Sequence, residues 1–159
     1  MSAPAASALL TMLSAERGAL AGFVTLLEQE QSLLMEGAQT EQLLTLSEQK
    51  SNDAVSLNHM ADARHALLQQ EIPRPDAETI QNWLGTHCAD GLPIWHDIVA
   101  LAQRAKQLNQ VNGELIQMKL RHNQQALTVL SNAVNKAGVY GRNGKPDFSP
   151  GSGRSLGSG

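Results

Sequence analysis

The amino-acid sequence contains few aromatic residues, one cysteine and no long uninterrupted hydrophobic run. Phe, Trp and Tyr together make up 3% of its 159 residues, and Val, Ile and Thr are too scattered to predict β-strands. Because Cys88 has no second cysteine to pair with, no internal disulfide can form, and a reducing compartment is expected. Since no run reaches the ~20 apolar residues of a membrane span, we expect no stable insertion into a membrane.

Common catalytic and metal-binding motifs are absent as well. The sequence has neither the G-x-x-x-x-G-K loop of nucleotide-binding proteins nor the H-E-x-x-H motif of metalloproteases. His87, Cys88 and Asp90 are residue types used in nucleophilic catalysis, but no catalytic signature surrounds them. His87, Cys88 and His96 could supply three zinc ligands, although their spacing matches no known zinc motif. We therefore expect no enzyme activity, no catalytic residue, no metal site and no cofactor.

Residues that favour helices are abundant: the chain has 23 Leu, 20 Ala and 14 Gln. Hydrophobic residues make up 42% of the chain, enough for a core, and the length is that of one ordinary domain. We predict an all-α fold, with an antiparallel helical hairpin or bundle over residues 1–136 and one very long C-terminal helix. The glycine- and serine-rich residues 137–159 are expected to form a disordered, flexible tail.

Heptad spacing predicts the first helix, over about residues 6–36. One apolar stripe recurs every seven residues: Leu13, Leu20, Leu27 and Leu34. Glu16 and Glu30 interrupt the neighbouring row, which favours a bundle helix over a two-stranded coiled coil. Gly18 and Gly22, four residues apart, are expected to permit close packing against a neighbouring helix.

Capping residues and prolines that interrupt helices predict the bounds of the next two helices. Gly37 ends the first helix, and Thr40 caps the second, over about 41–70. Its inner face is expected to comprise Leu43, Leu46, Leu57, Met60 and Leu67 or Leu68. After two prolines, Asp76 caps a short helix over 77–84.

The last helix is predicted to be the longest, over about 93–135, after a loop bracketed by Gly85 and Gly91. At 1.5 Å per residue it would span roughly 60–65 Å, against about 45 Å for the first helix. A seven-residue series runs along it: Ile94, Leu101, Leu108, Leu115 and Val129. A helix this long leaves part of its apolar side uncovered unless a partner covers it.

The N-terminal segment imitates a secretory signal but is expected to stay in the mature chain. It lacks a positively charged start, and its leucine series continues into the first helix without a break. We therefore expect a cytoplasmic protein.

The two halves of the chain differ in charge. Residues 1–97 carry 13 acidic and 4 basic side chains, whereas residues 98–159 carry 2 acidic and 8 basic ones. The basic residues form no cluster with stacking aromatics of the kind that nucleic-acid binding uses. We therefore expect acidic and basic helices to lie side by side in one bundle, and no nucleic-acid partner.

Two motifs in the C-terminal third resemble a known family. Residues 108–130 read LNQVNGELIQMKLRHNQQALTVL, and residues 140–144 read YGRNG. The patterns L-N-x-x-N-x-x-L and N-Q-Q-A-L-x-V-L, followed by Y-G-x-x-G, resemble the FlgN family of flagellar type III export chaperones. The resemblance covers most of residues 10–145, and the tail after Pro146 departs from the family pattern.

The resemblance implies a small cytoplasmic helical chaperone. Members of the family bind the hook–filament junction proteins FlgK and FlgL and cover the C-terminal helical segment through which these subunits polymerise. They then deliver the subunits to the export gate. By resemblance, Tyr140 would dock on the gate component FlhA; the alternative is that Tyr140, the only tyrosine, packs back onto the end of the bundle.

The motif helix also has the spacing of a helix-binding surface. Such surfaces place apolar anchors at i, i+3, i+4 and i+7. Leu108, Val111, Leu115 and Met118 have this spacing, and the flexible side chain of Met118 tolerates varied partners. Asn109, Asn112 and Asn123 can present amide groups beside the anchors and add specificity, or they can lie in a seam between helices and fix its register. Gly113 would allow another helix to approach closely. The predicted substrate-binding residues are Leu108, Asn109, Val111, Asn112, Leu115, Met118 and Asn123.

Two other functions stay open from the residues alone. His59, His65 and His122 could accept phosphate in a histidine phosphotransfer bundle, although none is followed by the Lys-Gly pair that such domains use. The other is a generic helical adaptor, against which the interrupted heptads of the first helix count. The sequence is compatible with a homo-oligomer and does not fix the oligomeric state.

Overall fold

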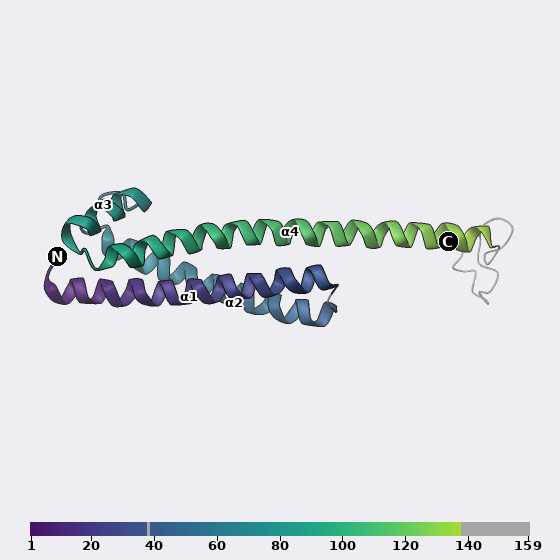
Figure 1. Ribbon diagram of the computed structural model, residues 1–159, viewed down its shortest axis with the longest axis horizontal. Helices are drawn as coiled ribbons and strands as arrows, with labels where there is room; N and C mark the ends of the chain where they lie inside the picture. The colour runs from purple at the N-terminus through teal and green to yellow at the C-terminus, as the bar shows by residue number, and fades with distance from the viewer. Residues whose placement is uncertain (38, 138–159) are drawn as a thin grey trace. The chain divides into compact units, whose positions relative to one another are not determined.

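The computed structural model describes residues 1–37 and 39–137, which contain four α-helices and no strand. The helices are α1 (Ala3–Glu36), α2 (Thr40–Leu68), α3 (Ala77–His87) and α4 (Gly91–Lys136) (Figure 1). The all-α class and the very long final helix are confirmed. The chain divides into two compact units, Met1–Leu115 and Ile116–Gly159, and α4 contributes to both. Of the tail predicted over residues 137–159, all but Ala137 lies outside the described residues.

Caps fix several of the helix ends. Ser2 Oγ accepts a hydrogen bond from the backbone N–H of Ala5 at 3.3 Å, so α1 begins earlier than predicted. Gly37 ends α1 in the left-handed conformation, with φ of 75°, as predicted. Asp76 Oδ1 accepts from the backbone N–H of Thr79 at 2.8 Å, and the Thr79 hydroxyl accepts from the backbone N–H of Asp76 at 2.8 Å. This capping box confirms the predicted start of α3, and its bond from the Thr79 backbone N–H lowers the pKa of Asp76.

Two predictions about α1 and α2 are wrong. Thr40 is the first residue of α2 rather than its cap, and Gln39 in the cap position makes no side-chain hydrogen bond. Gly18 and Gly22 are exposed, and a Cβ added to either would have no atom within 4 Å. These glycines therefore mediate no close helix packing among the described residues.

The predicted loop between Gly85 and Gly91 is shorter than expected. Helix α3 continues through Gly85 because the buried Leu84 anchors its last turn, and the Leu84 carbonyl still accepts the backbone N–H of Cys88. Gly91 is the first residue of α4, and an added Cβ there would lie 3.1 Å from Leu84 Cδ2. Close packing, rather than a need for chain flexibility, explains this glycine.

Two ion pairs with buried carboxylates join α1 to α2 as an antiparallel hairpin. Glu16, 5% exposed, accepts hydrogen bonds from Arg64 Nε at 2.8 Å and Nη2 at 3.1 Å. Glu30, 4% exposed, accepts from Lys50 Nζ at 3.2 Å to each carboxylate oxygen. Buried carboxylates need such partners because an unpaired buried charge costs several kcal/mol. The acids that interrupt the apolar row of α1 are therefore the points at which α2 is held.

The spacing of these pairs favours one register of the hairpin. Glu16 and Glu30 lie two heptads apart on α1, and their cationic partners lie the same distance apart on α2. A slip of one heptad would place Glu30 opposite Leu43 or Leu57 and leave its carboxylate without a cation. Since that arrangement costs several kcal/mol, the observed register is strongly preferred.

The first part of α4, up to Leu115, runs parallel to α1. Asp97 pairs with Arg17 at 3.0 Å, and further along both helices Arg104 pairs with Glu28 at 3.4 Å. Exposed pairs of this kind contribute about 0–1 kcal/mol, so burial of apolar side chains holds the helices together. The core between α1 and α4 includes Leu9, Leu13, Leu20, Leu27, Trp95, Ile98, Ala105 and Leu108.

The predicted apolar faces of α1 and α2 are confirmed, and that of α4 is confirmed in part. The buried residues of α1 include the whole predicted stripe, Leu13, Leu20, Leu27 and Leu34. On α2 only Leu68 is fully buried, and the other predicted residues are half-buried. On α4 the predicted Leu108 is buried together with Trp95, Ile98, Ala105 and Asn112, whereas Ile94, Leu101 and Leu115 of the predicted series are half-buried and Val129 is exposed. A helix of 3.6 residues per turn presents a broad face, which a strict seven-residue series follows only along its edge.

Helix α1 is long and apolar enough, by length and composition, to count as a candidate membrane span. Polar residues interrupt this helix, so it contains no uninterrupted apolar run of that length. Core helices of soluble bundles meet the same criterion, and here the apolar stripe of α1 packs against the other helices.

Candidate functional site

The structure separates the predicted substrate-binding residues into buried and exposed groups. Leu108 and Asn112 lie in the core, at 1% and 0% exposure. Val111 and Leu115 are half-buried, and Asn109 is exposed. These five residues belong to the unit Met1–Leu115, whereas Met118 and Asn123 belong to the second unit, where both are exposed.

Asn112 links three helices. Its side-chain Nδ2 donates to the backbone carbonyl of Leu27 at 2.9 Å and to Glu30 Oε1 at 2.8 Å. Because Glu30 also binds Lys50, the carboxylate joins α1 to both α2 and α4. A side chain enclosed in this way lies in the seam between helices, and a partner could contact it only if the bundle opened.

The buried amide of Asn112 is incompletely satisfied. Its Oδ1 has no hydrogen-bond partner among the described residues. A buried acceptor without a partner costs about 1–3 kcal/mol, which offsets part of what the two Nδ2 bonds contribute. The contribution of Asn112 is therefore positional: it aligns α4 with the carboxylate that also holds α2.

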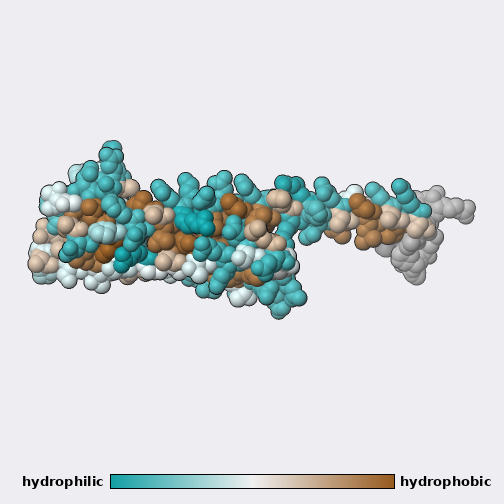
Figure 2. Space-filling view, in the orientation of Figure 1, coloured by the Kyte–Doolittle hydropathy of each residue, from teal (hydrophilic) through white to brown (hydrophobic). Residues whose placement is uncertain are grey.

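The second unit carries a row of exposed apolar side chains on α4. Ile116 is 37% exposed, Leu120 51%, Leu127 65% and Leu130 60%. They follow one another at steps of three and four residues, with Asn123 and the half-buried Val134 in the same row. The row Ile116, Leu120, Asn123, Leu127, Leu130 and Val134 is called the distal stripe below. Figure 2 shows apolar side chains on the surface toward the end of α4.

Most of the distal stripe was not predicted from the sequence, although a signal for it was present. The predicted seven-residue series runs through Leu108 and Leu115 to Val129, which lies on another side of the helix from Leu127 and Leu130. The buried row of α4 reaches Asn112, and two successive steps of four residues then lead to Ile116 and Leu120. A fixed seven-residue series drifts about 20° around an α-helix with each heptad, whereas steps of three and four residues keep the apolar row on one face.

Tyr140, the residue predicted to dock on the export gate, lies outside the described residues. Its predicted role therefore stays a prediction. Glu114 is the last acidic residue before the distal stripe, and residues 115–136 contain Lys119, Arg121 and Lys136 but no Asp or Glu. The segment that carries the distal stripe is therefore basic.

The residues with catalytic or metal-binding side chains are dispersed or make other contacts. The His87 ring stacks on Trp83, with centroids 4.9 Å apart, and its Nδ1 lies 3.1 Å from the Trp83 carbonyl oxygen. Cys88 is buried. Within residues 1–37 and 39–137, no three His, Cys, Asp or Glu side chains are grouped closely enough to hold a metal ion. The phosphoacceptor candidates His59, His65 and His122 are each exposed, on α2 or α4.

Comparison with known proteins gives a family and one relative. A family model described as FlgN protein matches residues 1–147, which include the whole distal stripe and Tyr140. The flagella synthesis protein FlgN of Escherichia coli (strain K12) is 29% identical over 122 residues, covering 76% of this chain and 77% of the relative. No solved structure matches the chain.

Proposed function

The chain belongs to the FlgN family, a family of chaperones in flagellum synthesis, and from this premise we propose which proteins it serves and how. It binds the hook–filament junction proteins FlgK and FlgL in the cytoplasm and covers their C-terminal helical segments. This prevents premature assembly, and the chain then delivers its clients to the type III export gate. The role requires neither a cofactor nor a chemical reaction.

The observation that carries this proposal is the exposure of the distal stripe. Contiguous exposed apolar residues on a soluble protein mark interaction sites. A row at steps of three and four residues is the form that a partner helix recognises, because its own apolar face can lie along the row. The client contributes the C-terminal helix that would otherwise pack against neighbouring subunits.

Asn123 gives the distal stripe selectivity. It interrupts the apolar row at its centre, so a helix lying along the stripe buries its amide. A buried amide without a partner costs about 1–3 kcal/mol, and a client with a matching polar group avoids that loss. Met118, 56% exposed, can adapt beside the stripe to more than one client. Leu108 and Asn112 act from the core by holding α4 in place.

The charge of the segment favours acidic clients. Lys119, Arg121 and Lys136 accompany the stripe, and residues 115–136 contain no acid. A client helix with carboxylates flanking its apolar face would be attracted to this segment and oriented on it. Binding should therefore weaken as salt concentration rises.

Titration calorimetry with purified FlgK and with FlgL tests the proposal on the full-length chain. Leu127→Asp removes an anchor and places a charge in the interface, and Gln125→Asp adds the same charge on the opposite side of α4. Burial of one leucine is worth about 1.5–3 kcal/mol, so Leu127→Asp should weaken binding by about 10–150-fold or more. Gln125→Asp should stay within about threefold, and circular dichroism should show both variants folded. Equal binding by the two variants, or no binding of either client by the unmodified chain, would refute the proposal.

Delivery to FlhA is the second step of the proposed function, and we assign it to Tyr140. Tyr140→Ala should leave the affinity for FlgK unchanged, since Tyr140 is outside the distal stripe. Binding to the cytoplasmic part of FlhA and motility should both fall. If Tyr140→Ala instead abolishes client binding or folding, the division between client binding and gate docking is wrong.

A further inference from the structure

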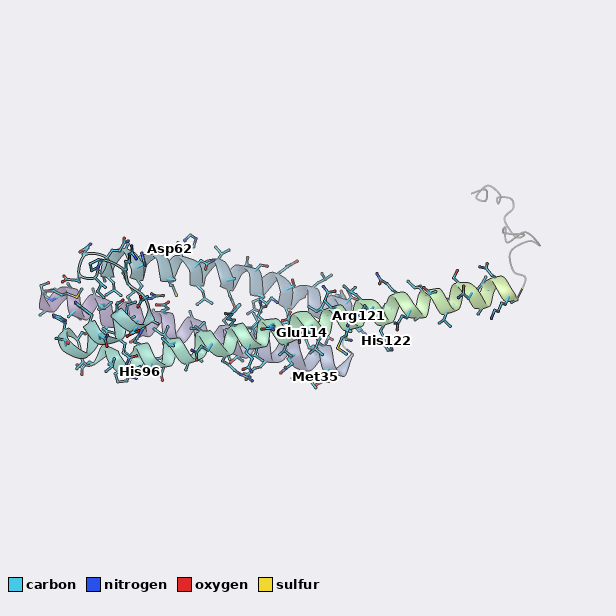
Figure 3. The ribbon with its side chains drawn as sticks, turned by 90° about the horizontal axis from the view of Figure 1, so that it is seen from above. Met35, Asp62, His96, Glu114, Arg121 and His122 are labelled. Atoms are coloured by element: carbon cyan, nitrogen blue, oxygen red, sulfur yellow. The ribbon has the colours of Figure 1, made fainter. Side chains whose placement is uncertain are left out.

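Apart from the distal stripe, the structure contains a groove in the unit Met1–Leu115, between α2 and the first part of α4. Two adjoining cavities, of about 520 and 300 Å³, lie between these helices, and Lys106 of α4 lines both. Helix α1 forms the floor, with Leu20 in the larger cavity and Phe23 in the smaller one. Figure 3 shows α2 and α4 on either side of α1 near the start of α4, with Asp62 and His96 on their outer edges; further along, α4 crosses over α1 in this view.

Both walls of the groove have the periodicity of a helix-packing surface. Four residues on each wall follow at steps of three, four and three: Ser51, Ala54, Asn58 and Ala61 on α2, and Val99, Ala102, Lys106 and Asn109 on α4. At 1.5 Å per residue each wall extends over about 15 Å, three turns of helix. Several of the wall residues are small, which lets a guest helix approach α2 and α4 closely.

One end of the groove is closed by α3. Ala77 and Ile80 line the larger cavity there, and the indole N–H of Trp95 donates to the Ala77 carbonyl at 3.1 Å. The guanidinium of Arg64 lies 4.9 Å from the centroid of the Trp95 ring. These contacts hold α3 against this end of the groove.

Three cationic side chains line the groove, and two of them are paired. Lys50 and Arg64 both line the cavities, but Glu30 and Glu16 neutralise them from α1. Lys106, which lies midway along the groove, makes no ion pair with any described residue. A guest with a carboxylate at the middle of its apolar face would complete the charge pairing. Residues 115–136 of this chain contain no acid and so cannot supply that group.

We propose that this groove binds an amphipathic helix of a partner protein that carries small or medium apolar side chains and a central Asp or Glu. The guest becomes the fourth long helix beside α1, α2 and α4. The site is separate from the distal stripe and does not rest on the proposed client binding.

Fluorescence anisotropy with labelled helical peptides tests this on the full-length chain. The probes are two peptides of about 18 residues, five turns, with Ala and Leu at the apolar positions and either Glu or Lys at the centre. The Glu peptide should bind at least about tenfold more tightly than the Lys peptide, and Lys106→Glu should reverse this preference. No saturable binding by the Glu peptide, or a preference that Lys106→Glu leaves unchanged, would overturn the proposal.

Paired variants locate the binding. Ala102→Phe fills the groove, whereas Ala100→Phe makes the same change at an exposed position roughly 200° around α4. Only Ala102→Phe should abolish binding, and Leu127→Asp should have no effect. If Leu127→Asp abolishes peptide binding, the peptide occupies the distal stripe; the groove proposal then fails while the proposed function stands. If sedimentation shows a dimer that Ala102→Phe dissociates, the occupant is a second copy, and the proposal is again overturned.

Discussion

The buried pair of Glu16 and Arg64 should make one substitution far more damaging than two. Arg64→Met removes the cation and leaves the Glu16 carboxylate 5% exposed without its bidentate partner. Breaking a buried pair on one side costs about 3–5 kcal/mol, because the remaining charge is desolvated and unpaired. Replacing both residues, with Glu16→Leu and Arg64→Met together, removes the charge as well as its partner. The double variant should therefore lie within about 1 kcal/mol of the unmodified chain or exceed it in stability.

Urea unfolding followed by circular dichroism measures this difference. For a slope of about 1.5 kcal/mol per molar urea, Arg64→Met should lower the unfolding midpoint by about 2–3 M. The double variant should return it to within about 0.7 M of the original value. Arg17→Met is the matched control, because it breaks the exposed pair with Asp97 and should cost about 0–1 kcal/mol.

The refuting result is a double variant as unstable as the single one. That outcome would show that Arg64 stabilises the hairpin by its packing, for instance against Trp95, and not by neutralising a buried carboxylate. An Arg64→Met variant whose free energy of unfolding lies within about 1 kcal/mol of the unmodified chain would equally contradict the account. It would show that water solvates the Glu16 carboxylate when Arg64 is absent.

Three other substitutions address separate parts of the structure. Asn112→Ala removes two hydrogen bonds from a fully buried amide and should cost about 1–3 kcal/mol in urea unfolding; no loss would mean that Glu30 is held by Lys50 alone. Gly113→Ala should add about 0.5–1 kcal/mol, because nothing lies within 4 Å of the added Cβ, and a destabilised variant would reveal a neighbour. The depressed pKa of Asp76, ordinarily 3.8, means that its stabilisation is present above that value and lost as pH falls through the lower folded-state pKa. Asp76→Asn should therefore reduce the fall in melting temperature below about pH 4; an unchanged fall would exclude the Asp76 cap as its source.

Features that depend on residues within one helix could be predicted from the sequence. The leucine stripe of α1 recurs with the turn of the helix, and all four of its residues are buried. Gly37 and Asp76 end and begin helices by local geometry, so residue type and position sufficed to predict them. The cap assigned to Thr40 failed because Ser and Thr favour cap positions without excluding the first turn.

Contacts between helices could not be read in the same way. The sequence shows that Glu16 and Glu30 interrupt an apolar row, but it does not show which cations face them across the hairpin. Likewise, the sequence is equally compatible with Asn112 in a seam between helices and with Asn112 on a binding surface. Only the position of α1 distinguishes the two. The end of the buried part of α4 depends on where the first unit ends, which heptad spacing alone does not indicate.

Site-specific photocrosslinking from position 127 tests the central claim most directly, that the distal stripe binds the client helix. A photoreactive phenylalanine analogue at Leu127, irradiated with bound FlgK and mapped by mass spectrometry, should crosslink to the C-terminal helical segment of FlgK. The same analogue at Gln125, on the opposite side of α4, should give no crosslink to that segment. A complex that forms but crosslinks equally from both positions, or from neither, would contradict the account.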